Sequence, residues 1–331
     1  MFQQTSTFLT RIPIELREQI YQRLDVLDRF NVWSCCDSER AVIDGMKVYY
    51  NCVMLSFYPN YLELEFQEPD REHHRMSIPV DQAMLTLKKV VHSSNTRIGA
   101  FSVTFDRRVG MEQSNLQGIL NQIRHTLMEL GRQLRVEKFE MEVFDTQEEV
   151  LKILPHLCSD TLKSISLIGP SVSRGLFNMD KVVVLDQWKK AKYFKSAALS
   201  LNVSVEHLMH FSVVETKLPN LRAEDMKIIV QNYTQTGNLM HFEARVLPSK
   251  FHSLLAHLDQ NASDDFACTL ARINPQSCLY VALHIVDPHH PMLGVYKLDM
   301  SIEEAHQLGP FDKFSHIPFL RENQKKLKDV M

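Results

Sequence analysis

Short stretches in which apolar and polar residues alternate recur along most of this chain, with helical patterns between them. The segments 61–66 (YLELEF), 100–105 (AFSVTF) and 138–144 (KFEMEVF) show the alternation clearly. In the middle of the chain such segments follow one another at roughly 25 to 40 residues, which is the length of one strand–helix unit. Successive βα units favour a largely parallel sheet, so the sequence predicts an α/β fold.

The alternating segments and the helical segments can be placed along the whole chain. Strands are expected at 61–66, 100–105, 138–144, 162–168, 196–201, 211–214, 242–246, 279–286 and 295–300. Helices are expected at about 81–92, 112–131, 147–157, 180–192, 205–210 and 223–233. This order predicts a leucine-rich-repeat-like βα array, and a compact doubly wound sheet is the alternative. The last two strands predict a C-terminal antiparallel β-hairpin that closes the sheet edge.

Composition narrows the possible function classes. Hydrophobic residues make up 44% of the 331 residues and charged residues 23%, so the chain can bury a core and is not intrinsically disordered. A net charge of -3 gives no general attraction to nucleic acid or to an anionic membrane surface. The chain has only 10 glycines, which disfavours folds built on glycine-rich phosphate loops.

The six cysteines form no C-x-x-C pair, and the sequence begins without a basic, then apolar, signal segment. Reduced thiols are therefore expected, together with a cytoplasmic or nuclear location. No stretch approaches 18 consecutive apolar residues, so no transmembrane helix is predicted.

The first fifty residues predict a small helical unit. Thr10 can cap a helix and Pro13 suits its first turn, since proline lacks the N–H that would have no partner there. Leu16, Ile20 and Leu24 then form one apolar stripe, which Ile14 and Leu27 extend. Further helices are expected at 28–36 and at 39–43, where Gly45 provides a stop. Three short helices cannot bury their apolar faces alone, so the unit needs a partner or a neighbouring domain.

The stretch 12–44, IPIELREQIYQRLDVLDRFNVWSCCDSERAVID, resembles an F-box, the three-helix motif that docks the Skp adaptor of cullin-based ubiquitin ligases. The matching positions are Pro13, Glu15, Leu16, Ile20, Leu24, Asp25, Asp28, Phe30, Val32, Cys36, Arg40, Val42, Ile43 and Asp44. Three positions depart from the common pattern: Val26 replaces a proline, Arg29 a leucine and Glu39 a tryptophan.

The F-box resemblance implies binding to a Skp-type adaptor and, through it, to a cullin. The residues expected to contact the adaptor are Pro13, Ile14, Leu16, Ile20, Leu24, Leu27, Phe30 and Val32. The alternative is an amphipathic helical cap on the larger domain, with Leu16, Ile20 and Leu24 in its core.

The segment from about residue 157 to 246 is similar to the FTH domain, which follows the F-box in a large nematode family of F-box proteins. The similarity rests on the stretches TLKSISLIG (161–169), LDQWKKAKYFKS (185–196), VEHLMHFSVVETKL (205–218) and RAEDMKIIVQNYTQTGNLMHFEARV (222–246). The expected domains are an F-box at 8–50, a βα spacer at 55–156, an FTH-like substrate-recognition region at 157–300 and a solvated tail at 301–331.

No nucleotide-binding, hydrolase, metalloprotease or kinase motif occurs in the sequence. The histidine pairs His73-His74, His207 with His210, and His289-His290 are not accompanied by a cysteine or carboxylate at a supporting spacing. We therefore expect no metal, no cofactor and no catalytic residue, and we expect Trp188 and Cys35-Cys36 to pack their helices.

The sequence thus predicts a non-catalytic subunit of a Skp–cullin–F-box ubiquitin ligase. Its F-box would bind the adaptor, and its α/β region would hold a protein target, without contact to nucleic acid or a membrane. Two alternatives remain open: a protein-interaction scaffold with a helical N-terminal cap, and a hydrolase or transferase whose histidine and carboxylate meet only in the folded chain.

Overall fold

The computed structural model describes residues 11–59, 61–69, 71, 73–105, 113–169, 175–246, 254, 266–274, 276–285 and 291–298. The chain divides into two compact units. Unit 1 comprises residues 1–141 and 148–162, and unit 2 comprises residues 142–147 and 163–331.

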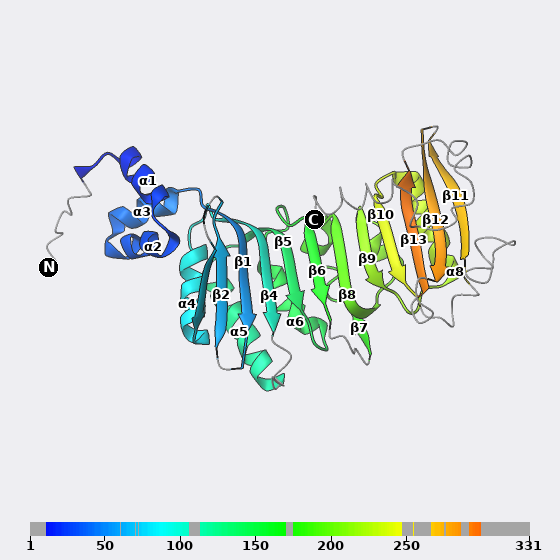
Figure 1. Ribbon diagram of the computed structural model, residues 1–331, viewed down its shortest axis with the longest axis horizontal. Helices are drawn as coiled ribbons and strands as arrows, with labels where there is room; N and C mark the ends of the chain where they lie inside the picture. The colour runs from blue at the N-terminus through cyan, green and yellow to red at the C-terminus, as the bar shows by residue number, and fades with distance from the viewer. Residues whose placement is uncertain are drawn as a thin grey trace. The chain divides into compact units, whose positions relative to one another are not determined.

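Unit 1 begins with three short helices: α1 (Ile14–Arg23), α2 (Val26–Cys35) and α3 (Asp37–Gly45) (Figure 1). Pro13 precedes the first helical residue of α1, as expected, whereas Thr10 lies outside the described residues. Helix α2 starts two residues earlier than predicted, because the Asp25 carboxylate accepts a hydrogen bond of 2.8 Å from the Asp28 backbone N–H and caps it.

The sheet of unit 1 has five strands: β1 (Tyr49–Phe57), β2 (Leu62–Gln67), β3 (His74–Ile78), β4 (Arg97–Phe105) and β5 (Arg135–Glu142). Their order is β3-β2-β1-β4-β5. The pairs β1–β4 and β4–β5 are parallel, while β1, β2 and β3 form an antiparallel meander. Helices α4 (Val80–Val91) and α5 (Gln113–Glu129) are the connections between these strands, and α6 (Gln147–Leu151) follows β5.

One face of this sheet forms the core of unit 1. In β1, Val53, Leu55 and Phe57 are fully buried, and α4 and α5 lie on one side of the sheet (Figure 1). The intervening residues Cys52 and Met54 are only half-buried. Side chains on the second face are therefore accessible, and this face carries the polar groups of the strands.

Unit 2 continues the βα alternation. Its elements are β6 (Ser164–Ile168), β7 (Leu176–Asn178), α7 (Asp186–Lys190), β8 (Tyr193–Asn202), β9 (Val213–Lys217), α8 (Ala223–Thr236), β10 (His241–Arg245), β11 (Phe266–Asn274), β12 (Ser277–Ile285) and β13 (Pro291–Leu298). The strand order is β6-β8-β9-β10-β13-β12-β11, and β7 pairs with the end of β8. Strands β6, β8, β9 and β10 are parallel, and β13, β12 and β11 are antiparallel.

Aromatic side chains fill the core of unit 2. Trp188 is fully buried and lies edge-on to Phe194 and Phe211, with ring centroids 4.7 and 5.0 Å apart. Its indole N–H donates a 3.0 Å hydrogen bond to the His207 carbonyl. The prediction that Trp188 packs a helix onto the sheet is confirmed.

The α/β fold is confirmed, and so is the antiparallel pairing of the last two predicted strands, now β12 and β13. That hairpin does not close the sheet edge, however, because β11 pairs with the far side of β12. The helix expected at 180–192 is shortened to α7, and residues 205–208 form a 3-10 helix. The tail predicted at 301–331 lies outside the described residues. Within the described ranges, no helix combines the length and apolarity that crossing a membrane requires.

Candidate functional site: the apolar face of the first helix

Helix α1 places several of its large apolar side chains on the surface. Ile14, Leu16 and Ile20 are 48, 49 and 42% exposed, and Pro13 before them is exposed as well. The residue of α1 that is buried is Tyr21, which forms a small core with Val42, Ile43 and Met46. Ile14 lies seven residues before Tyr21 and therefore on the other side of the helix from Leu16 and Ile20, so we call Pro13, Leu16 and Ile20 the α1 apolar face. Solvent-exposed apolar groups that cluster in this way are typical of an interaction surface.

The other four residues predicted to contact an adaptor lie differently. Leu24 and Val32 are half-buried and pack against the Tyr21 core. Phe30 stacks on Trp33, with centroids 5.2 Å apart, and the Lys89 ammonium of α4 lies 4.2 Å from the centre of the Phe30 ring. Leu27 is in α2, and its side chain lies outside the described set. The cap alternative predicted that Leu16 and Ile20 lie in the core. This prediction is wrong, because both side chains are exposed.

Comparison with known protein families agrees with this three-helix geometry. A family model for the F-box domain matches residues 9–51, and a model for the FTH domain matches residues 117–261. The chain carries an F-box domain followed by an FTH domain. No curated protein and no solved structure matches the chain significantly. The FTH match begins well before the stretch 157–246 on which the sequence resemblance rests.

The three departures from the common F-box pattern are all buried inside unit 1. Val26 is the first residue of α2 and is 5% exposed. The Glu39 carboxylate on α3 accepts hydrogen bonds from the Tyr21 hydroxyl and, at 3.0 Å, from the Arg17 guanidinium. Burial, followed by the bond to Glu39, raises the pKa of Tyr21, so its hydroxyl stays protonated and donates. None of the three departures contributes to the α1 apolar face.

Arg29, the second departure, links the F-box to the rest of unit 1. Its guanidinium is buried and forms an ion pair with Glu68, which follows β2. Arg71 pairs with the same carboxylate at 3.0 Å, and it also donates to the backbone carbonyls of Leu24 and Gln22. Burial lowers the pKa of Arg29, partly offset by neighbouring Tyr50. The segment between β2 and β3 therefore contacts the F-box in two ways. Glu68 pairs with Arg29 of α2, and Arg71 donates to the carbonyls at the end of α1.

A second set of contacts holds the end of α3. The Asn95 amide donates to the Gly45 carbonyl at 3.1 Å, and the Ser93 hydroxyl donates to the Asp44 carbonyl at 3.2 Å. The Asp44 carboxylate also accepts from the Trp33 indole at 3.1 Å and lies 3.0 Å from the His92 ring. The contacts of His92, Ser93 and Asn95 join residues about fifty positions apart, so no local sequence pattern predicts them.

The FTH region has a hollow of about 400 Å³ where strands β8 and β9 end. Its lining residues are Leu201, Asn202, Val203, Ser204, Val205, Leu218, Asn220, Leu221, Arg222 and Asp225. The Asp225 carboxylate accepts from the Arg222 backbone N–H at 2.8 Å and caps α8. This lining does not contain a histidine that could act with Asp225 in acid–base catalysis.

Proposed function

We propose that the chain is the substrate-recognition subunit of a Skp–cullin–F-box ubiquitin ligase. The α1 apolar face binds a Skp-type adaptor, the adaptor connects the chain to a cullin, and the α/β region binds a protein target. The chain itself has no catalytic role. It raises the effective concentration of target lysines near the ubiquitin-charged enzyme, which is catalysis by proximity. We further propose that it acts in the cytoplasm or nucleus, where such ligases work.

The observation that carries this proposal is the exposure of the α1 apolar face within a domain that matches the F-box model. Leu16 and Ile20 lie four residues apart on one side of α1, so they can enter one groove of a partner together. Full burial of a leucine or isoleucine side chain contributes roughly 1.5–3 kcal/mol. A helix that leaves such groups in water gains this energy only when a partner covers them.

The test is a pull-down of the purified full chain with a panel of Skp-type adaptors. Wild type is expected to capture at least one adaptor, and the Leu16→Asp/Ile20→Asp double variant is expected to lose more than about 99% of the affinity, since two apolar anchors are replaced by charges. Leu85→Asp is the matched control, because Leu85 on α4 is 60% exposed and belongs to the same unit.

Capture by a folded double variant as strong as by wild type would contradict the proposal, as would failure of a folded wild type to bind every adaptor. Circular dichroism and thermal unfolding of all three proteins show whether they are folded. Leu24 is a less useful mutation site, because it packs against the Tyr21 core. Its replacement by aspartate would disturb folding as well as binding.

The scaffold with a helical N-terminal cap remains a second candidate. Two sets of contacts favour the scaffold hypothesis: the buried Arg29–Glu68 pair and the contacts of Asp44. Both connect the three helices to later residues of unit 1. These contacts also mean that deleting the helices cannot distinguish the two hypotheses. The deletion would destabilise the rest of unit 1 whether the helices are an F-box or a cap. Adaptor capture by the α1 apolar face distinguishes them directly.

A further inference from the structure

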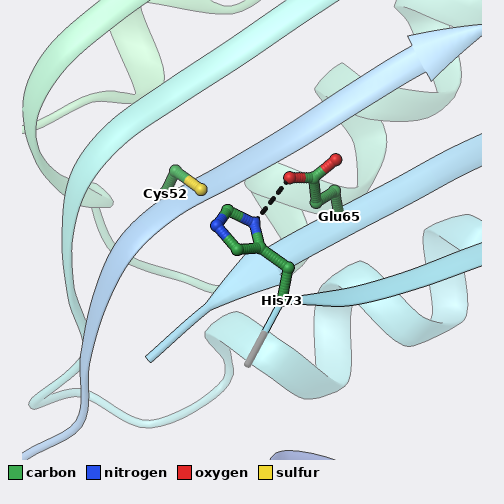
Figure 2. Close-up of side chains that lie close together, drawn as sticks. All are labelled: Cys52, Glu65 and His73. Carbon is green, nitrogen blue, oxygen red and sulfur yellow. Dashed lines mark hydrogen bonds and ion pairs between the residues drawn. The ribbon is translucent and has the colours of Figure 1, made fainter. Parts of the chain in front are cut away.

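Three side chains with metal-binding groups meet on the accessible face of the unit 1 sheet. They are Cys52 on β1, Glu65 on β2 and His73 immediately before β3 (Figure 2). One ligand atom from each residue lies within 4.8 Å of the other two. The His73 Nδ1 atom is 2.7 Å from a Glu65 carboxylate oxygen. Figure 2 shows the imidazole between the thiol and the carboxylate, with one ring nitrogen facing the carboxylate.

The antiparallel register explains why these residues meet. Cys52 pairs with Gln67, and Met54 pairs with Glu65, so Cys52 and Glu65 are diagonal neighbours on one face. His74 pairs with Phe66, whose side chain is buried on the opposite face. His73, one residue earlier, is therefore placed on the face of Glu65. The sequence predicted no metal site at His73-His74, because no cysteine or carboxylate lies at a supporting spacing in the chain. The neighbouring strands supply both.

We propose that Cys52, Glu65 and His73 form a Zn²⁺ site, with a thiolate, a carboxylate oxygen and an imidazole nitrogen as three of its four ligands. Sulfur, nitrogen and oxygen donors in this combination suit Zn²⁺ better than Mg²⁺ or Ca²⁺, which prefer oxygen ligands alone. The fourth position is filled by water, because the His73 side chain is 53% exposed and the site opens to solvent.

The geometry requires a small adjustment. Zinc bonds of about 2.0–2.3 Å place tetrahedral ligands roughly 3.3–3.6 Å apart, whereas the ligand atoms here lie within 4.8 Å of one another and the His73 Nδ1 atom is 2.7 Å from a Glu65 oxygen, so the side chains must rearrange by about 1 Å. The exposed imidazole of His73 can make this movement by side-chain rotation. The Cys52 thiol binds as a thiolate, and its proton passes to solvent. Burial and the Glu65 charge raise the pKa of Cys52, so the thiol carries that proton at neutral pH until the ion displaces it.

The proposed ion lies beside the segment that holds the F-box. Glu65 and His73 flank residues 66–72, and this segment includes Glu68 and Arg71, which contact Arg29 and the carbonyls of α1. An ion that joins both ends of this segment to β1 stabilises the folded state, because the three ligands are brought together only in the folded chain. We therefore infer a structural role, in which Zn²⁺ stabilises the connection between the F-box and the sheet.

The test uses the full chain and two probes, Zn²⁺ and its spectroscopic substitute Co²⁺. Titration with Co²⁺ under reducing conditions is expected to produce a saturable sulfur-to-cobalt charge-transfer band at one equivalent, which Zn²⁺ abolishes by displacement. Cys52→Ser removes the band, and His73→Ala and Glu65→Gln each weaken Co²⁺ binding by at least about tenfold.

Two matched controls distinguish this site from other thiols and histidines. Cys158→Ser changes another half-buried free thiol of unit 1, and His74→Ala changes the adjacent histidine, which stacks on Phe66. Both controls are expected to bind Co²⁺ like wild type. The proposal is overturned if wild type gives no saturable band, if Cys52→Ser keeps it, or if His74→Ala loses it while His73→Ala does not.

Thermal unfolding gives a second readout that does not depend on cobalt spectroscopy. Zn²⁺ is expected to raise the Tm of wild type, of Cys158→Ser and of His74→Ala, and to raise the Tm of the conservative Glu65→Gln variant by clearly less. An equal rise for wild type and Glu65→Gln would place any bound zinc elsewhere in the chain. These outcomes are independent of adaptor capture, so failure of the zinc site and failure of the ligase proposal can be told apart.

Discussion

At the scale of single residues, the buried ion pair of Arg29 and Glu68 is the most consequential departure from the F-box pattern. Replacing Arg29 by leucine, the residue common in F-boxes, removes one of the two arginines that pair with the Glu68 carboxylate and leaves Arg71 in place. Removing one member of a buried pair typically costs about 3–5 kcal/mol, and we expect the lower end here because Arg71 remains. Urea unfolding of the full chain measures this change.

The double variant Arg29→Leu/Glu68→Leu is the control for that experiment. When both charges are replaced by apolar groups, neither Arg29 nor Glu68 is left as an unpaired buried charge, and the partly exposed Arg71, which loses Glu68, still donates to the Leu24 and Gln22 carbonyls, so stability should recover by more than half. A single variant that costs less than about 1 kcal/mol would show that Glu68 is solvated or fully satisfied by Arg71.

His210 makes unit 2 sensitive to pH. Burial lowers the pKa of His210, and its Nε2–H donates to the Trp188 carbonyl at 2.8 Å. The unfolded chain, whose histidines titrate near about 6.5, therefore binds the proton more readily than the folded chain. The contribution of neutral His210 to the free energy of unfolding is therefore complete above that pH, and it is lost as the pH drops from about 7 to 5.

His210→Gln should reduce this fall, since glutamine can donate to the same carbonyl and carries no charge. Unfolding is followed by Trp188 fluorescence in a Trp33→Phe background, because Trp33 and Trp188 are the two tryptophans of the chain. His125→Gln, at a solvent-exposed position of α5, serves as the comparison. Identical pH profiles for wild type and His210→Gln would contradict the assignment.

At the scale of elements, the parallel pairing of β1 with β4 depends on Gly99. A Cβ atom built on Gly99 would lie 2.6 Å from the Asn51 carbonyl oxygen and 2.8 Å from the Tyr49 hydroxyl. The backbone of β1 cannot move away freely, because β2 pairs with its other side. We expect Gly99→Ala to lower the free energy of unfolding by about 1–3 kcal/mol.

Gly118 on α5 is the matched control, since a Cβ there would meet no atom within 4 Å. Gly118→Ala is expected to raise stability by roughly 0.5–1 kcal/mol, because alanine loses less backbone entropy in a helix. Thermal unfolding of both variants provides the comparison. Equal effects of the two substitutions would show that β1 and β4 are not tightly apposed at this point.

The elements predicted from sequence are those with clear apolar periodicity. Helix α4 and strand β2 were found within one or two residues, because their buried positions follow the expected spacing. Strand β1 was missed because Met54 lies between buried Val53 and Leu55 and hides the alternation. Strand β3 was missed because none of its residues is buried. An edge strand gives no apolar signal of its own and is defined by its partner.

The candidate site was predictable in the same uneven way. The four-residue spacing of Leu16 and Ile20 predicted that both lie on one side of a helix. It did not predict whether that side faces the core or the solvent. The burial of Tyr21 decides this question, because its ring takes the core position between α1 and α3 and its hydroxyl reaches Glu39. That choice depends on a partner eighteen residues away, which no local pattern specifies.

At the scale of the whole molecule, the F-box belongs to the same compact unit as the sheet that follows it. Residues 11–46 are joined to later parts of unit 1 by the contacts described above for Arg29, Arg71, Ser93 and Asn95. The contacts described for Trp188, in contrast, lie within unit 2. The chain therefore combines an F-box that contacts the rest of unit 1 with a second unit that has its own core.

This arrangement predicts the result of deleting residues 1–46. The truncated chain loses the partners of Glu68 and Arg71, so unit 1 should exchange backbone amide hydrogens faster in β1 and α4 than the full chain does. The deletion also removes Trp33 and leaves Trp188 as the sole tryptophan, whose fluorescence reports on unit 2. The unfolding transition seen by Trp188 should shift by less than about 0.5 kcal/mol, because its core partners are retained. Loss of the Trp188 transition on truncation would show that unit 2 depends on the F-box for folding, whereas unchanged exchange in β1 and α4 would show that the F-box is a freely detachable domain.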